Sequence, residues 1–130
     1  MGARGNIQID QDPMGQETPD SLFLYTHWAG GQICEILASA LEKGEPRWND
    51  DGYMTRIIFN ELQGDDRDLT GFAIQVGFAP DNEYEIPRVF WTVLSGADNF
   101  HQPRIRVEYN GIVRTPEEWI AFFLPASQRA

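Results

Sequence analysis

The spacing of apolar residues changes twice along the chain, and this change constrains the fold more than any other feature. Within residues 33–41 the apolar positions recur every three or four residues, which predicts an amphipathic helix. Residues 53–62 have the same period and predict a second helix, which Asn49 or Asp50 can cap. The segments on both sides of this helical pair alternate between apolar and polar residues, as strands do. We therefore expect an α+β fold.

Strand patterns and a third helix complete this prediction. Alternation, or a β-branched and aromatic composition, predicts strands at residues 3–9, 21–28, 71–78, 88–94, 104–109 and 112–114. Asn110-Gly111 predicts a type I′ turn between the last two strands. Thr115-Pro116-Glu117-Glu118 is a capping box before an apolar C-terminal helix. The order predicts an antiparallel sheet of four to six strands, with two central helices and a C-terminal helix packed on it.

The length and composition indicate one folded domain over residues 1–130. Hydrophobic residues make up 42% and aromatic residues 12% of the chain, which excludes the composition of a disordered protein. No apolar run approaches the roughly 18 residues of a membrane span, and the N-terminus lacks the pattern of a signal peptide. The single cysteine, Cys34, fits a reducing compartment. We therefore expect a cytoplasmic protein that does not bind membranes.

The charge is strongly negative and unevenly distributed. The chain has 20 acidic and 10 basic residues, a net charge of −10. Residues 1–86 contain 16 acids and 5 bases, whereas residues 87–130 contain 4 acids and 5 bases. Binding to a phosphate backbone needs clustered positive charge, so we expect no direct nucleic-acid binding. A negative surface instead favours a partner protein with a basic surface.

Two acidic clusters are candidate partner-binding residues. They are Asp65, Asp66 and Asp68 in one loop, and Asp81, Glu83 and Glu85 in another. Neither follows the spacing of a calcium-binding loop, so the sequence predicts no metal site. Solvated loops without a partner are the alternative interpretation.

The segment from Tyr25 to Gly31 is the most unusual local motif. His27 and Trp28 close a predicted strand, and Gly30 and Gly31 lead into a helix whose N-terminus can hold an anion. Tyr25, His27, Trp28, Gly30 and Gly31 are therefore candidate ligand-binding residues. The alternative is a tight structural turn, because the glycine spacing of a phosphate-binding loop is absent.

Arg47 and Trp48 between the two helices extend this candidate site. Trp48 could stack on a ligand while Arg47 contacts an anion, or Trp48 could pack between the helices. Cys34 and His27 could form a nucleophilic pair, but a cysteine beside an apolar stripe is more often a small buried side chain. The sequence therefore identifies no catalytic residue and no cofactor.

The same motifs carry a resemblance to a known group of proteins. The matching segments are Met1-Gly2-Ala3-Arg4, Leu24 to Gly30, Arg47 to Tyr53, Arg56 to Phe59, Thr70-Gly71-Phe72 and Asp81-Asn82-Glu83. Together they resemble small bacterial and phage-associated proteins of unassigned activity with a Tyr-x-His-Trp-x-Gly pattern. The resemblance extends to about Tyr84. It implies a stand-alone intracellular protein of the kind carried on mobile elements, and it supplies no catalytic residues.

Three functions are consistent with these features. The leading hypothesis is an acidic interaction module, for example a phage-encoded inhibitor that acts on a basic host defence protein and imitates the charge of a nucleic acid. The second is a small-ligand-binding protein or enzyme with its site at the junction from His27 to Gly31. The third is an assembly component, for example a homodimer through an exposed strand or through the aromatic C-terminal helix.

Overall fold

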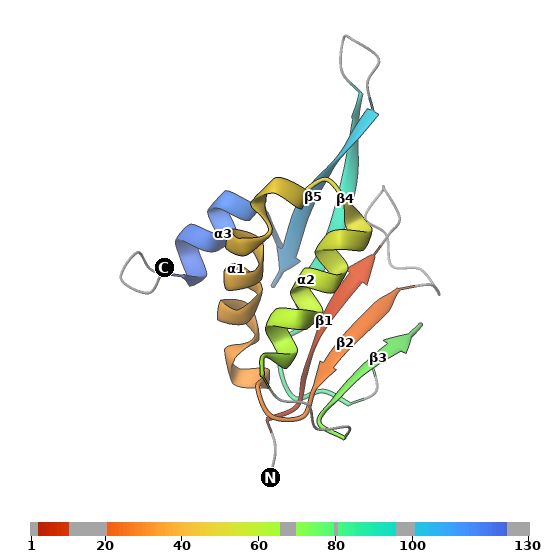
Figure 1. The fold of residues 1–130 in the computed structure, drawn as a ribbon, viewed down its shortest axis with the longest axis vertical. Helices are drawn as coiled ribbons and strands as arrows, with labels where there is room; N and C mark the ends of the chain where they lie inside the picture. The colour runs from red at the N-terminus through yellow and green to blue at the C-terminus, as the bar shows by residue number, and fades with distance from the viewer. Residues whose placement is uncertain (1–2, 11–20, 66–69, 80, 96–100, 125–130) are drawn as a thin grey trace.

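Six strands form one sheet at the places where the sequence alternates. The computed structural model describes residues 3–10, 21–65, 70–79, 81–95 and 101–124. The strands are β1 (Gly5–Asp10), β2 (Leu22–Thr26), β3 (Phe72–Val76), β4 (Arg88–Ser95), β5 (His101–Tyr109) and β6 (Ile112–Arg114). Their spatial order is β3-β2-β1-β4-β5-β6 (Figure 1).

Four of the five strand pairings are antiparallel, and the pairing of β1 with β4 is parallel. The chain leaves β3 at one edge of the sheet and enters β4 on the far side of β1, which gives β4 the direction of β1. Asn110 and Gly111 both have positive φ, 57° and 79°, as the predicted type I′ turn requires. The predicted α+β fold with four to six strands is therefore confirmed, in a mostly antiparallel sheet.

The helices also begin and end where the sequence indicates. They are α1 (Ile33–Lys43), α2 (Asp51–Gln63) and α3 (Pro116–Phe123), with short 3-10 turns η1 (Gly30–Gln32) and η2 (Glu45–Arg47) before α1 and before α2. Asp50 accepts a hydrogen bond from the Tyr53 amide and caps α2, while Thr115 and Glu118 form the predicted capping box of α3. No helix in the described part of the chain has the length and apolar character needed to cross a membrane.

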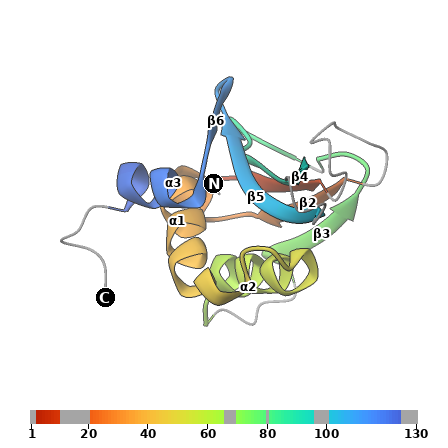
Figure 2. The same cartoon turned by 90° about the horizontal axis from the view of Figure 1, so that it is seen from above.

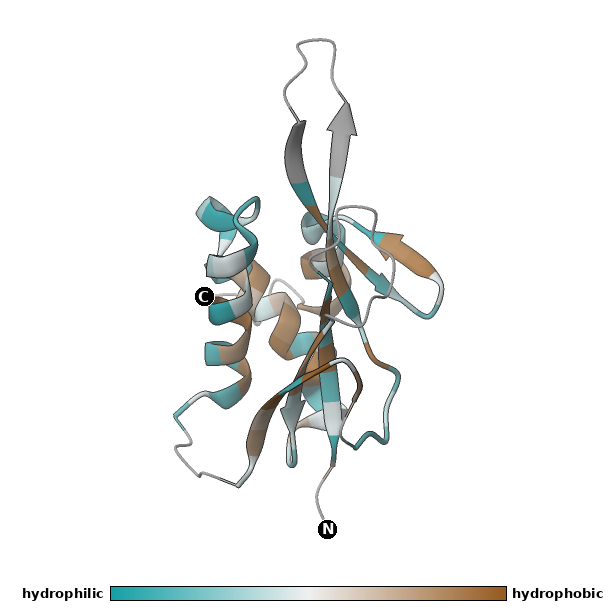
Figure 3. Ribbon diagram, turned by 90° about the vertical axis from the view of Figure 1, so that its right-hand side faces the viewer, coloured by the Kyte–Doolittle hydropathy of each residue, from teal (hydrophilic) through white to brown (hydrophobic). Residues whose placement is uncertain are grey.

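The main core lies between the helices and one face of the sheet (Figure 2). Ile7, Ile9 and Leu24 project from the central strands, and Leu37 and Leu41 project from α1, all of them fully buried. In Figure 3 hydrophobic colour gathers between the helices and the sheet, while the outer side of the helical layer is hydrophilic. Burial of these aliphatic side chains holds the two layers together.

The opposite face of β1 is also buried, but it is polar. Asn6, Gln8 and Asp10 point to this face and are 1%, 7% and 0% exposed. The Asp10 carboxylate accepts hydrogen bonds from Gln8 at 3.1 Å, from the Ser21 hydroxyl, and from Arg88 at 3.0 Å. A buried carboxylate needs such partners, because removing its charge from water is costly. The polar face therefore contributes structural hydrogen bonds.

Candidate functional site

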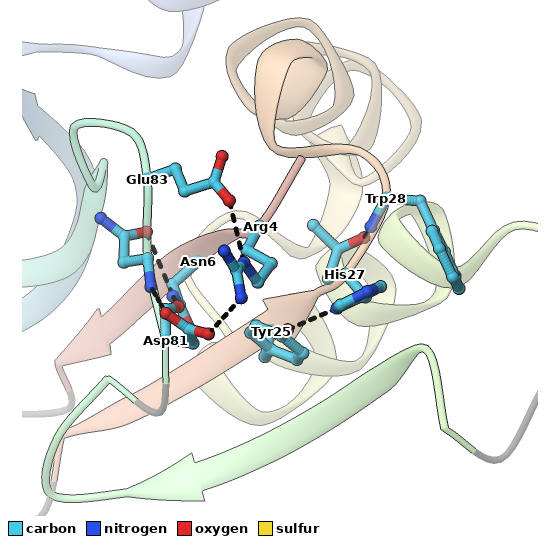
Figure 4. Close-up of polar contacts among 9 residues, drawn as sticks. Arg4, Asn6, Tyr25, His27, Trp28, Asp81 and Glu83 are labelled. Atoms are coloured by element: carbon cyan, nitrogen blue, oxygen red, sulfur yellow. Dashed lines mark hydrogen bonds and ion pairs between the residues drawn. The ribbon is translucent and has the colours of Figure 1, made fainter. Parts of the chain in front are cut away.

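The predicted junction forms an aromatic cluster at the end of β2 (Figure 4). The Tyr25 hydroxyl and His27 Nδ1 lie 3.0 Å apart, and the rings of His27 and Trp28 meet edge to face at 4.4 Å. Trp28 is 51% exposed. Burial raises the pKa of Tyr25 above its usual value, and the negative charge of Asp81 adds to the effect. His27 therefore contacts both Tyr25 and Trp28.

Hydrogen bonds within the protein already hold this junction in place. The Thr26 hydroxyl accepts from the amides of Trp28 and Ala29, at 3.2 and 3.1 Å. The His27 amide donates to the Gly71 carbonyl at 2.9 Å. A Cβ on Gly71 would lie 2.4 Å from Nε1 of Trp28, so the indole packs directly on this glycine. The amides of Trp28 and Ala29 are therefore engaged within the turn.

Gly30 has a structural role, whereas Gly31 is exposed. The Gly30 amide donates to the Ala3 carbonyl at 2.7 Å, and a Cβ on Gly30 would lie 2.7 Å from that oxygen and 2.8 Å from the Tyr84 ring. For Gly31 the nearest atom to such a Cβ, the Tyr84 hydroxyl, is 3.5 Å away. Position 30 therefore requires a glycine because Ala3 and Tyr84 of the protein itself lie so close to it.

Two of the predicted acidic residues pair with an arginine of the protein. Arg4 contacts Asp81 at 2.9 Å through Nη1 and Glu83 at 2.8 Å through Nε (Figure 4). The hydrogen bond to Glu83 and the charge of Asp81 raise the pKa of Arg4. Asn6 also donates to the Asp81 carbonyl at 2.6 Å. These contacts fasten the crossover between β3 and β4 to β1, so Asp81 and Glu83 are engaged within the fold.

The other predicted acidic residues are exposed or lie outside the described residues. Asp65 and Glu85 are exposed, and neither forms a salt bridge with another described residue. Asp66 and Asp68 lie outside the residues that the structure describes. Among the described residues of the clusters at 65–68 and 81–85, the exposed carboxylates without a salt bridge are thus those of Asp65 and Glu85.

Arg47 and Trp48 lie at the other end of α1 from the junction (Figure 1). The helix has 11 residues and is about 16 Å long. Trp48 donates from Nε1 to the Leu41 carbonyl and accepts from Nε1 of Trp91, both at 2.8 Å. The Arg47 guanidinium lies over the Tyr53 ring at 4.5 Å. The seven predicted ligand-binding residues therefore form two separate groups.

Cys34 contacts Tyr109, and His27 contacts Tyr25. Cys34 is 7% exposed, and burial raises its pKa, although a hydrogen bond with Tyr109 opposes the rise. Burial and the same hydrogen bond raise the pKa of Tyr109 to about 12. A nucleophilic thiolate requires a lowered pKa, so the surroundings of Cys34 favour a structural role.

A hollow of about 310 Å³ opens where α1, η2 and α3 meet. We call it the acidic hollow; it is lined by Glu42, Glu45, Trp48, Glu117, Ile120 and Ala121. None of its three carboxylates forms a salt bridge with any residue that the structure describes. Sequence reasoning missed this site, because positions 45 and 117 come together only when α3 packs against α1.

A second hollow, of about 280 Å³, adjoins the acidic hollow. We call it the arginine hollow; its lining includes Trp48, Asn49, Arg104, Arg106, Thr115 and Glu117. Trp48 and Glu117 line both hollows. Trp48, one of the two predicted residues Arg47 and Trp48, thus lies at a surface of mixed charge, away from the junction.

The described residues contain no group of three or more histidine, cysteine or acidic side chains placed to hold a metal ion. Comparison of the chain with protein-family models, curated proteins and solved structures gives no match.

Proposed function

We propose that the protein is an interaction module that binds a basic protein partner through the acidic hollow. The observation that supports this proposal is the convergence of Glu42, Glu45 and Glu117 from α1, η2 and α3 on one concave surface. Like charges repel one another, so three neighbouring carboxylates without a salt bridge among the described residues favour a cation from outside.

The apolar lining of the hollow suits a lysine or arginine side chain. Trp48 and Ile120 lie beside the carboxylates, so the aliphatic stem of such a side chain can pack on them. Its charged end can then form charge-assisted hydrogen bonds with the glutamates. The net charge of −10 attracts a basic partner over a longer range and speeds its approach.

The concrete form of the proposal is a cytoplasmic inhibitor, encoded by a phage or another mobile element, that occupies the basic surface of a host protein. A surface of this kind normally binds nucleic acid, so the inhibitor competes for it with negative charge. Supporting this are the acidity of the chain and its single buried cysteine, which suits a reducing compartment.

The test is affinity capture from a lysate of the organism that carries the gene. We expect the wild-type protein to retain a protein with a basic surface, and the variant Glu42→Gln, Glu45→Gln, Glu117→Gln to lose it. The matched control Glu35→Gln, Asp65→Asn, Glu85→Gln also removes three negative charges, all of them exposed, but it leaves the hollow intact. It should retain the partner.

If both variants lose the partner equally, binding depends on the overall charge of the protein, and this result would contradict a role for the hollow. Retention by both variants would contradict the proposal altogether. A small molecule that copurifies with the protein, and is lost in a His27→Ala variant that stays folded, would instead support the ligand site at the junction.

A further inference from the structure

Neighbouring arginines on the β4–β5 pair have very different surroundings. Arg88 lies opposite Glu108 and contacts its carboxylate, and it also contacts Asp10 at 3.0 Å. Arg104 and Arg106 lie opposite Thr92 and Phe90, which carry no charge. Neither of these two arginines forms a salt bridge with a described residue. In a chain with twice as many acids as bases, this is an unusual arrangement.

The two arginines lie where one edge of β5 is open. β6 pairs with β5 only from Tyr109 back to Val107, so no strand of the described part of the chain lies along the outer edge of β5 beside Arg104 and Arg106. Arg106 donates from Nη1 to the Ile105 carbonyl at 2.7 Å. Trp48 and Thr115 form other parts of the wall of the arginine hollow. The result is a concave surface whose lining includes two arginines at the edge of β5.

The charges around this hollow favour an anion near β5. Arg104 and Arg106 are two positions apart on one strand and share a face, so their charges repel each other unless an anion lies between them. Glu118 is engaged by the capping box through Thr115. Hydrogen bonds to that residue lower its pKa most, and the charges of Arg106 and Arg114 lower it further. Glu117 is the one carboxylate in the lining, and it also faces the acidic hollow.

We infer that the arginine hollow binds a carboxylate of the same partner whose cationic side chain occupies the acidic hollow. This inference rests on the proposed function and adds to it the kind of segment that is recognised. Because Trp48 and Glu117 line both hollows, a cation and a carboxylate close together in one segment can occupy them at the same time. Planar guanidinium groups form paired hydrogen bonds with a carboxylate, which gives the site a preferred direction.

Short peptides test the inference without the natural partner. Each peptide carries one lysine and one glutamate separated by one, two or three serines, in both orders, and analogues replace either charged residue with glutamine. Binding is followed by NMR through the shifts of the arginine Nε and Trp48 indole signals. We expect at least one peptide to bind about fivefold more tightly than its glutamate-to-glutamine analogue, about 1 kcal/mol for a partly exposed ion pair.

Variants assign this preference to the two hollows. Arg104→Gln, Arg106→Gln should abolish the advantage of glutamate over glutamine in the peptide, and the control Lys43→Gln, Arg56→Gln should preserve it. Glu42→Gln, Glu45→Gln, Glu117→Gln should abolish the advantage of lysine. Equal binding of the glutamate and glutamine peptides to the wild-type protein would overturn the inference. A surviving preference for lysine would then leave the proposed function in place, whereas loss of both preferences would contradict both.

Discussion

Single residues in the junction show why an unusual motif is not by itself a site. The glycines next to His27 and Trp28 suggest room for a ligand, but the space above Gly30 is filled by Ala3 and Tyr84. The sequence could not predict this packing, because Tyr84 is 54 positions away and reaches the junction through the crossover between β3 and β4. Arg4 likewise pairs with Asp81, 77 positions later in the chain.

Alanine substitutions at the two glycines should therefore have different effects. In Gly30→Ala the new methyl group overlaps backbone atoms, so we expect a loss of about 1–3 kcal/mol in the free energy of unfolding. Gly31→Ala meets nothing closer than 3.5 Å and is the matched control, with a change within about 0.5 kcal/mol. Urea denaturation measures both values. Equal stability of the two variants would mean that Gly30 does not need its close approach to the chain.

At the scale of elements, the sequence predicted the helices, their caps and the turns, because these depend on residues that are neighbours in the chain. The change of period located α1 and α2, Asp50 and the box from Thr115 to Glu118 located two helix starts, and Asn110-Gly111 located a turn. The parallel pairing of β1 with β4 was not predicted. It follows from the path of a crossover with few apolar residues, whose position depends on contacts with Arg4 and Asn6.

Tyr109 joins three elements and makes their packing sensitive to alkaline pH. Its ring meets those of Trp119 and Phe123 edge to face at 5.7 and 6.0 Å, and its hydroxyl interacts with Cys34 of α1. Burial raises its pKa from 10 to about 12. The folded state thus disfavours the ionised form, so this stability is fully present below pH 10 and is lost as the pH rises toward about 12.

We expect the free energy of unfolding to fall across this pH range in the wild-type protein. The fall should be smaller in Tyr109→Phe, which keeps the ring and has no ionisable hydroxyl. Urea denaturation at a series of pH values between about 9 and 12 measures both curves. Identical slopes in the two proteins would show that Tyr109 ionises as freely in the folded state as in the unfolded chain.

At the scale of the whole molecule, the charges are sorted by layer. Residues 33–65, which form α1, η2 and α2, contain seven acids and three bases, and α3 adds two acids. Residues 88–114, which form β4 to β6, contain four arginines and two acids. The uneven charge was visible in the sequence. Its arrangement as two adjoining hollows was not, because Glu117 lines one hollow with Glu42 and the other with Arg104 only once α3 has packed on α1 and β5.

The measurement that tests the central claim most directly is the salt dependence of binding to the protein that the wild type captures. Its Kd is measured at about 50 mM and about 500 mM salt, for the wild type and for Glu42→Gln, Glu45→Gln, Glu117→Gln. Salt screens exposed charges, so we expect the wild-type complex to weaken about tenfold or more. The variant should bind weakly at both concentrations. An unchanged wild-type Kd at high salt would contradict binding by the acidic hollow.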